Sequence, residues 1–126
     1  MEGFTNGEFA VIQAAWKALD DKFAVDITVL DIRSVSTLAD CFIIAAGHNP
    51  TQIRAMADEV EQRLESVGVP LRHAEGRRTM NWILLDFGSL IVHIFDKENR
   101  SFYNLERVWR DAKVIPSDVL AGMSTT

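Results

Sequence analysis

Apolar residues recur at alternating spacings of three and four near the start of the chain. They are Phe9, Ile12, Trp16, Leu19 and Phe23. This spacing places side chains on one face of a helix. Thr5 and Glu8 have the spacing of a capping box, which satisfies free N–H groups in a first helical turn. The pattern predicts an amphipathic helix that ends by Ala24.

A second helix is predicted between Asn49 and Gly68. Asn49 is a favoured N-cap, Pro50 suits the first helical position, and Gln52 completes a variant of the capping box. Gly68 stands where the left-handed residue that follows a helix is often found. The inward stripe consists of Ile53, Met56, Ala57, Val60, Leu64 and Val67.

Strand patterns lie on both sides of this second helix. Val25 to Ile32 is rich in β-branched residues, and the continuous apolar run from Cys41 to Gly47 suits a strand covered on both faces. After the helix, the pattern predicts strands at residues 69–76, 82–87 and 90–95 and a helix at 101–112. The order is therefore α-β-β-α-β-β-β-α, with a strand–helix–strand crossover around the second helix.

This order predicts one α/β (α+β) domain over residues 1–126, with a mixed sheet and packed helices. Residues 113–126 carry no clear period, so we expect a C-terminal tail that frays at its end.

The last two predicted strands form a hairpin around the turn signal Gly88-Ser89. With a two-residue loop, Leu84 pairs with His93 and Trp82 pairs with Phe95, and opposite residues share a face. One face is then entirely apolar: Ile83, Leu85, Phe87, Leu90, Val92 and Ile94. The other face is mixed: Trp82, Leu84, Asp86, Ile91, His93 and Phe95.

The mixed face has two interpretations. In the first, a helix covers the face, and Asp86 and His93 form hydrogen bonds inside the protein. In the second, the face is partly exposed and Trp82 anchors a partner, because Trp is enriched among interface hot spots. The sequence pattern leaves both open.

Charge bears on the kind of partner. The chain has 18 acidic and 13 basic residues and a formal net charge of −5. Proteins that bind nucleic acid through phosphates usually present a basic face, which this composition does not favour. We therefore expect a basic or neutral protein partner and little direct contact with nucleic acid.

The sequence offers little for catalysis, metals or cofactors. A nucleotidyltransferase would need two carboxylates two residues apart on a strand to hold metal ions, and Asp26 and Asp31 are five apart. The three histidines and the single cysteine, Cys41, lack metal-ligand spacing. A Cys41–His93 nucleophile couple is conceivable, but the apolar run around Cys41 favours a buried, inert thiol. We expect no enzyme activity and no cofactor.

The ends and hydropathy of the chain bear on localisation. The first fifteen residues contain no Lys or Arg, unlike a secretory signal or a mitochondrial presequence. No apolar stretch approaches the ~20 residues of a membrane helix. We expect a cytoplasmic protein without a membrane segment.

Several motifs resemble one known family. They are D-I-x-V-L-D-I-R from Asp26, S-x-x-A-D-C-F-I-I-A-x-G from Ser36, Q-I-x-A-M-A-D-E-V from Gln52, E-G-R at Glu75, W-I-L-L-D-F-G from Trp82, V-H-I-F at Val92 and R-x-F-Y-N-L-E-R-V-W from Arg100. Their order and spacing over residues 26–112 resemble the ribosomal silencing factors, also called the Iojap family.

This resemblance implies a nucleotidyltransferase-like fold with a mixed five-stranded sheet. The missing carboxylate pair indicates that the fold does not bring that activity with it. It also implies binding to ribosomal protein number fourteen of the large ribosomal subunit, at the face that meets the small subunit. A bound factor would block subunit joining and repress translation. Members often form homodimers when free. Two alternatives are a large-subunit assembly factor that uses the same surface, and an enzyme on the same fold.

For the partner-binding surface we predict residues of the hairpin and of the last predicted helix. They are Trp82, Leu85, Asp86, His93, Tyr103, Leu105, Glu106 and Trp109. Leu85 conflicts with the hairpin pattern, which places it on the apolar face. Trp82 and Trp109 each have an alternative role in the core.

Overall fold

Six strands form one mixed sheet in the computed structural model, which describes residues 3–98 and 110–121. The strands are β1 (Val25–Asp31), β2 (Cys41–Gly47), β3 (His73–Glu75), β4 (Trp82–Asp86), β5 (Leu90–Asp96) and β6 (Lys113–Ile115). The helices are α1 (Asn6–Asp21), α2 (Pro50–Ser66) and the short α5 (Ser117–Leu120). The expected fold class, a mixed sheet with packed helices, is confirmed.

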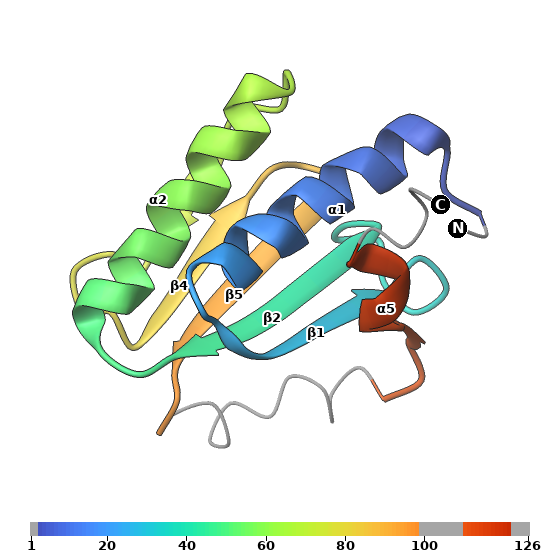
Figure 1. Ribbon diagram of the computed structural model, residues 1–126. Coiled ribbons are helices and arrows are strands. Elements are labelled where there is room, and N and C mark those ends of the chain that lie inside the picture. Colours follow the sequence, from blue (N-terminus) through green and yellow to red (C-terminus); the bar gives the residue numbers. More distant parts are fainter. Residues whose placement is uncertain (1–2, 99–109, 122–126) are drawn as a thin grey trace.

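The strand order across the sheet is β3-β4-β5-β2-β1-β6. The central strands β2 and β5 run parallel, and all the remaining neighbouring strands pair antiparallel. The chain passes from β2 to β5 through α2 and the β3–β4 strands, so the parallel pair needs the predicted helical crossover. Figure 1 shows α1 and α2 on the same side of the sheet, where they pack against each other.

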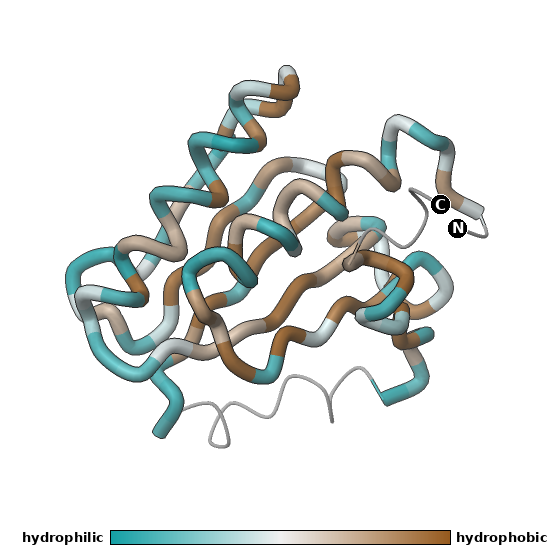
Figure 2. The backbone as a smooth tube through the Cα atoms, in the orientation of Figure 1, coloured by the Kyte–Doolittle hydropathy of each residue, from teal (hydrophilic) through white to brown (hydrophobic). Residues whose placement is uncertain are grey.

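Apolar residues fill both sides of the sheet. The larger cluster lies between the sheet and the helices, and it includes Ile12 and Leu19 of α1 and Val60 of α2. A smaller cluster on the opposite face includes Phe42 and Phe95. Figure 2 shows hydrophobic colour along the central strands and hydrophilic colour on the outer side of α2, as an amphipathic helix requires.

The predicted helix caps are largely confirmed. Thr5 and Glu8 form the full capping box of α1. At α2, the Asn49 carboxamide accepts the backbone N–H of Gln52 at 2.8 Å. The Gln52 side chain differs from the prediction: its Oε1 accepts the backbone N–H of His48 at 2.6 Å. It therefore fixes the loop before the helix instead of the cap residue itself.

The prediction of five strands and a C-terminal tail was wrong, because β6 adds a sixth strand beside β1. Ile115 pairs with Val29, and Leu120 of α5 is fully buried in the helix-side core. A three-residue strand with one buried position is too short to show alternation, which explains why the sequence pattern missed it.

One other predicted element is shorter in the structure, and one lies mostly outside the described residues. The strand expected at 69–76 is confined to His73–Glu75, while Val69 and Leu71 pack against the helix-side core as loop residues. Of the helix expected at 101–112, residues 101–109 lie outside the described residues, and residues 110–112 form a turn before β6 and are not helical.

Leu120 tests whether the C-terminal segment belongs to the core. We expect Leu120→Ala to lower the free energy of unfolding by about 2–4 kcal/mol, because it removes a fully buried side chain and leaves a cavity. Its neighbour Val119 is 37% exposed, so Val119→Ala should change stability by less than about 1 kcal/mol. Urea unfolding followed by circular dichroism measures both, and equal small effects would contradict a structural role for α5.

Candidate functional site

The β4–β5 hairpin has the register predicted from its alternation. The pairs are Trp82–Phe95, Ile83–Ile94, Leu84–His93, Leu85–Val92 and Asp86–Ile91. The backbone N–H of Phe87 donates to the Leu90 carbonyl at 2.9 Å, which closes the two-residue loop. The six residues of the apolar face are all buried in the core between sheet and helices.

The mixed face differs between its two strands. On β5, Ile91, His93 and Phe95 are buried. On β4, Trp82 and Leu84 are half-buried and pack at the margin of the smaller cluster. The face is therefore divided: its β5 side chains lie inside the protein, and its β4 side chains are partly accessible. The described helices α1 and α2 pack on the opposite face of the sheet and not on this one.

Trp82 is fixed by polar and aromatic contacts. Its indole Nε1–H donates to Nδ1 of His93 at 3.1 Å. Its ring stacks on Phe95 with a centroid distance of 5.2 Å, and His93 meets Phe42 edge to face at 4.7 Å. A half-buried aromatic ring held in one orientation loses little conformational entropy when it binds a partner.

His93 is a neutral hydrogen-bond acceptor in this cluster. Since Nδ1 accepts from Trp82, the ring proton is on Nε2, which finds no hydrogen-bond partner among the described residues. The side chain is 4% exposed, and burial lowers its pKa to about 4. His93 therefore orients Trp82 without contributing charge at neutral pH.

Asp86 and Leu85 lie on opposite faces of β4. Asp86 is half-buried on the face of Trp82, at the turn end of the strand. Asp86 Oδ1 accepts the backbone N–H of Gly88 at 2.8 Å, so this carboxylate shapes the hairpin turn. Leu85 is fully buried on the helix-side face. The prediction that Leu85 contributes to a binding surface is incompatible with this burial, because alternation along β4 turns it away from Trp82.

The loop before β4 packs closely against the backbone of Trp82. Gly76 has φ +88, and a Cβ at this position would lie 1.9 Å from the Trp82 carbonyl oxygen. The next residue, Arg77, donates to Asp58 at 3.1 Å and to Glu61 at 2.6 Å, which ties the loop to α2. The sequence pattern did not identify Gly76 as a positioning residue, because the contact depends on tertiary structure.

The predicted contacts Tyr103, Leu105, Glu106 and Trp109 lie outside the described residues. Their role in partner binding stays a prediction.

Cys41 and His93 are on opposite faces of the sheet. Cys41 belongs to the helix-side cluster, whereas His93 contacts Phe42 of the opposite cluster. Burial raises the pKa of the Cys41 thiol to about 12, so the thiolate is scarce at neutral pH. These two residues therefore do not form a nucleophile–base couple.

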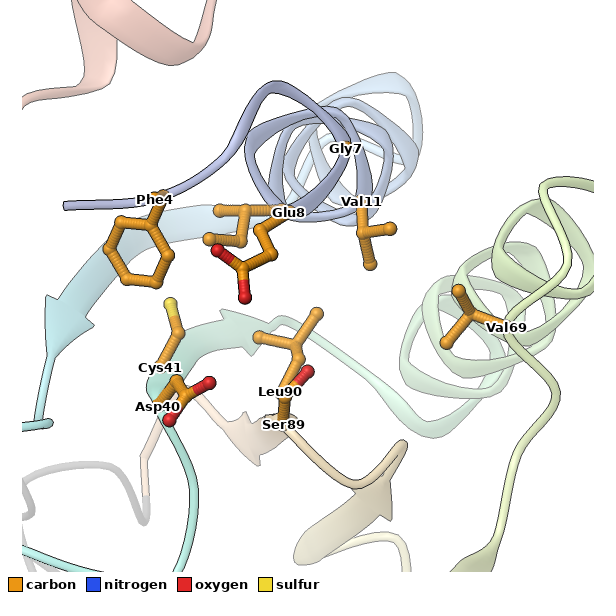
Figure 3. A pocket seen from close by; sticks show the side chains of 10 residues that line it. Phe4, Gly7, Glu8, Val11, Asp40, Cys41, Val69, Ser89 and Leu90 are labelled. Carbon is orange, nitrogen blue, oxygen red and sulfur yellow. The ribbon is translucent and has the colours of Figure 1, made fainter. Parts of the chain in front are cut away.

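A cavity of about 160 Å³ lies beside Cys41, between the start of α1 and the end of the sheet where β5 begins. Figure 3 shows the Glu8 and Asp40 side chains among apolar residues such as Phe4 and Val11. Glu8 Oε1 accepts the backbone N–H of Thr5, so this carboxylate is engaged in the helix cap. Over residues 3–98 and 110–121, no group of three His, Cys, Asp or Glu side chains is arranged to hold a metal ion.

Within the same described ranges, no helix has the length and apolar character needed to cross a membrane.

The fold is a mixed α/β domain. At one end of its sheet, Trp82, His93, Phe95 and Phe42 form an aromatic cluster. A family model described as "Ribosomal silencing factor during starvation" matches residues 6–125. A ribosomal silencing factor of Bacillus subtilis is 38% identical over 109 residues, which are 86% of this chain and 92% of the relative. The chain belongs to the family of ribosomal silencing factors.

Two further relatives extend the comparison. A crystal structure from Chromobacterium violaceum superimposes with a TM-score of 0.77 at 31% identity, covering 79% of this chain and 83% of that chain. The mouse protein named "Mitochondrial assembly of ribosomal large subunit protein 1" is 26% identical over 114 residues, which cover 79% of this chain and 50% of that protein. The family expected from the motifs is confirmed.

The buried state of His93 predicts a pH effect on stability. The pKa of His93 is lower in the folded chain, about 4, than the 6.5 of an ordinary histidine, so the unfolded chain takes up the proton first as pH falls. This contribution to stability is complete above pH 6.5 and is lost as pH falls toward 4. Between pH ~7.5 and ~5 the loss should be roughly 2 kcal/mol.

Urea unfolding of the wild-type chain and of His93→Gln measures this effect as a difference between the two pH profiles. The variant removes the imidazole and keeps the carboxylates, whose titration then cancels. A difference that stays constant from neutral to acidic pH would show that His93 is not buried in the neutral form.

Proposed function

We propose that this protein binds the large ribosomal subunit and represses translation by preventing the small subunit from joining. The observation that carries this proposal is the match to the silencing-factor family, which extends over residues 6–125 and over nearly the whole length of the Bacillus subtilis relative. The match therefore covers most of the length of that relative.

The proposed contact is ribosomal protein number fourteen of the large subunit, as the family resemblance implied. A net charge of −5 suits a basic protein surface, since opposite charge aids encounter and orientation. The half-buried Trp82, held by His93 and stacked on Phe95, supplies an aromatic contact of the kind enriched at interface hot spots. A factor bound at the joining face would exclude the small subunit by its volume alone.

We further propose that this action involves no catalysis, which the separation of Cys41 and His93 and the raised pKa of the thiol support. A free homodimer and a cytoplasmic location complete the proposal. The family resemblance implies the homodimer, and the sequence is the basis of the expected location.

A second candidate function is assembly of the large subunit, which the printed name of the mouse relative suggests. The two roles would use the same surface. They differ in cells that lack the protein: an assembly role predicts accumulation of immature large subunits, whereas silencing predicts mature subunits that join in excess during starvation.

A subunit-joining experiment tests the leading proposal. Purified large subunits are incubated with excess protein, small subunits are added at raised magnesium, and the products are separated on a sucrose gradient. We expect the peak of complete ribosomes to fall as the protein concentration rises. Unchanged ribosome formation at saturating protein would refute the silencing function.

Trp82 should be necessary for binding to the large subunit and so for the loss of complete ribosomes. We expect Trp82→Ala to weaken binding to large subunits at least tenfold, about 1.4 kcal/mol, because it removes the accessible aromatic ring. Co-sedimentation measures binding, and circular dichroism checks that the fold is retained. Leu38→Ser is the matched control, because Leu38 is a large apolar residue, 68% exposed, in the β1–β2 loop at the other end of the sheet. An unfolded Trp82→Ala variant, or equal binding by both variants, would argue against a Trp82 contact.

A further inference from the structure

The two long helices end with the same hydrogen-bond pattern. After α1, the Phe23 N–H donates to the Asp20 carbonyl at 3.0 Å and the Ala24 N–H donates to the Leu19 carbonyl at 3.0 Å. After α2, Gly68 occupies the position equivalent to Phe23, with its N–H on the Glu65 carbonyl at 3.0 Å. This is the Schellman motif, and it requires a left-handed residue at that position.

The two motifs differ in the residue that adopts the left-handed conformation. Gly68 has φ +87, which costs glycine nothing sterically. Phe23 has φ +62, a conformation that a bulky side chain rarely adopts because its Cβ approaches the backbone. Glycine would therefore serve the fold better at position 23.

Burial does not compensate this strain. The Phe23 side chain is 81% exposed, the largest exposed fraction among the large hydrophobic residues of the described ranges. Two other non-glycine residues in the described ranges have positive φ, and each has a reason to tolerate this conformation. Met80 is buried in the core, and Asp26 belongs to a residue type that tolerates this conformation. An unexplained strained residue points to a function outside the fold.

The turn that carries Phe23 is held in place. Nε2 of Gln52 donates to the backbone carbonyls of Lys22 and Phe23, each at 3.0 Å. The other end of the same carboxamide accepts the His48 N–H. Gln52 thus joins the α1–β1 turn to the β2–α2 loop, so the exposed ring is presented on a fixed backbone and loses little freedom on binding.

Phe23 lies at the same end of the sheet as Trp82. One row of paired residues crosses the sheet there: Val25 with Ala46, Ala46 with Phe95, and Phe95 with Trp82. Neighbouring strands are ~4.8 Å apart, so the row from β1 to β4 spans ~15 Å. A standard interface buries ~800 Å² on each partner. A contact patch of that area extends farther across the surface than the distance from β1 to β4. One partner can therefore contact both aromatic residues, and Figure 1 shows the α1–β1 turn and the start of β4 at the same end of the molecule.

We propose that Phe23 is a second aromatic contact for the partner that binds at Trp82, and that the contacted surface is protein. Asp20 and Asp26 are exposed on either side of Phe23 in the sequence, and they would repel nucleic-acid phosphates but attract a basic protein surface. The proposal rests on the proposed function, because the partner is taken to be the large ribosomal subunit.

The experiment compares Phe23→Gly, Phe23→Tyr and Leu38→Ser with the wild-type chain. Phe23→Gly copies the end of α2, so it should raise the thermal midpoint by a few degrees. The same variant should bind purified large subunits about tenfold more weakly (about 1.4 kcal/mol). Phe23→Tyr keeps the ring and should bind within about twofold of wild type, as should Leu38→Ser.

Opposite changes in stability and binding would separate a contact residue from a structural one. Wild-type affinity in Phe23→Gly would overturn the proposal while leaving the proposed function intact, and so would a lowered thermal midpoint. Failure of the wild-type chain to bind large subunits would refute both. Equal loss of affinity for protein-free large-subunit RNA would show that the contacted surface is RNA, contrary to the proposal.

Discussion

The parallel pair β2–β5 is buried on both faces, and this double burial determines how the rest of the chain must be arranged. Every residue of β2 and all but the last of β5 are buried. A parallel pair needs a crossover, which α2 and the β3–β4 strands supply, and it needs cover on each side. The helices cover one face, while the smaller cluster around Phe42 and Phe95 lies on the other.

The aromatic cluster follows from this arrangement. β4 joins the sheet beside β5, farther from the centre, so a side chain on its mixed face is covered on one side and accessible on the other. Trp82 occupies that position, and its indole N–H needs an acceptor because it is partly buried. His93 supplies the acceptor from the neighbouring strand, and burial keeps that imidazole neutral. The surface proposed for binding is thus an extension of the core.

Local signals in the sequence predicted much of this fold. Alternation gave the register of the hairpin, and the Asn49–Pro50 pair gave the start of α2, because both depend on neighbouring residues. The sequence did not reveal β6, whose three residues form a strand only by pairing with β1. Nor did it reveal the role of Gly76, and it wrongly placed Phe23 in the apolar stripe of the first helix, whereas Phe23 follows α1 and is 81% exposed. A close backbone approach and a left-handed aromatic residue become visible only once distant segments are placed together.

In the proposed function, one end of the sheet, around Trp82, contacts the large ribosomal subunit at the face where the small subunit joins. Electron cryomicroscopy of large subunits saturated with the wild-type protein would show where the domain binds. We expect density for the domain on ribosomal protein number fourteen, with Trp82 in the interface and the small-subunit position obstructed. Density at a site away from the joining face, or with the Trp82 end turned toward solvent, would contradict it.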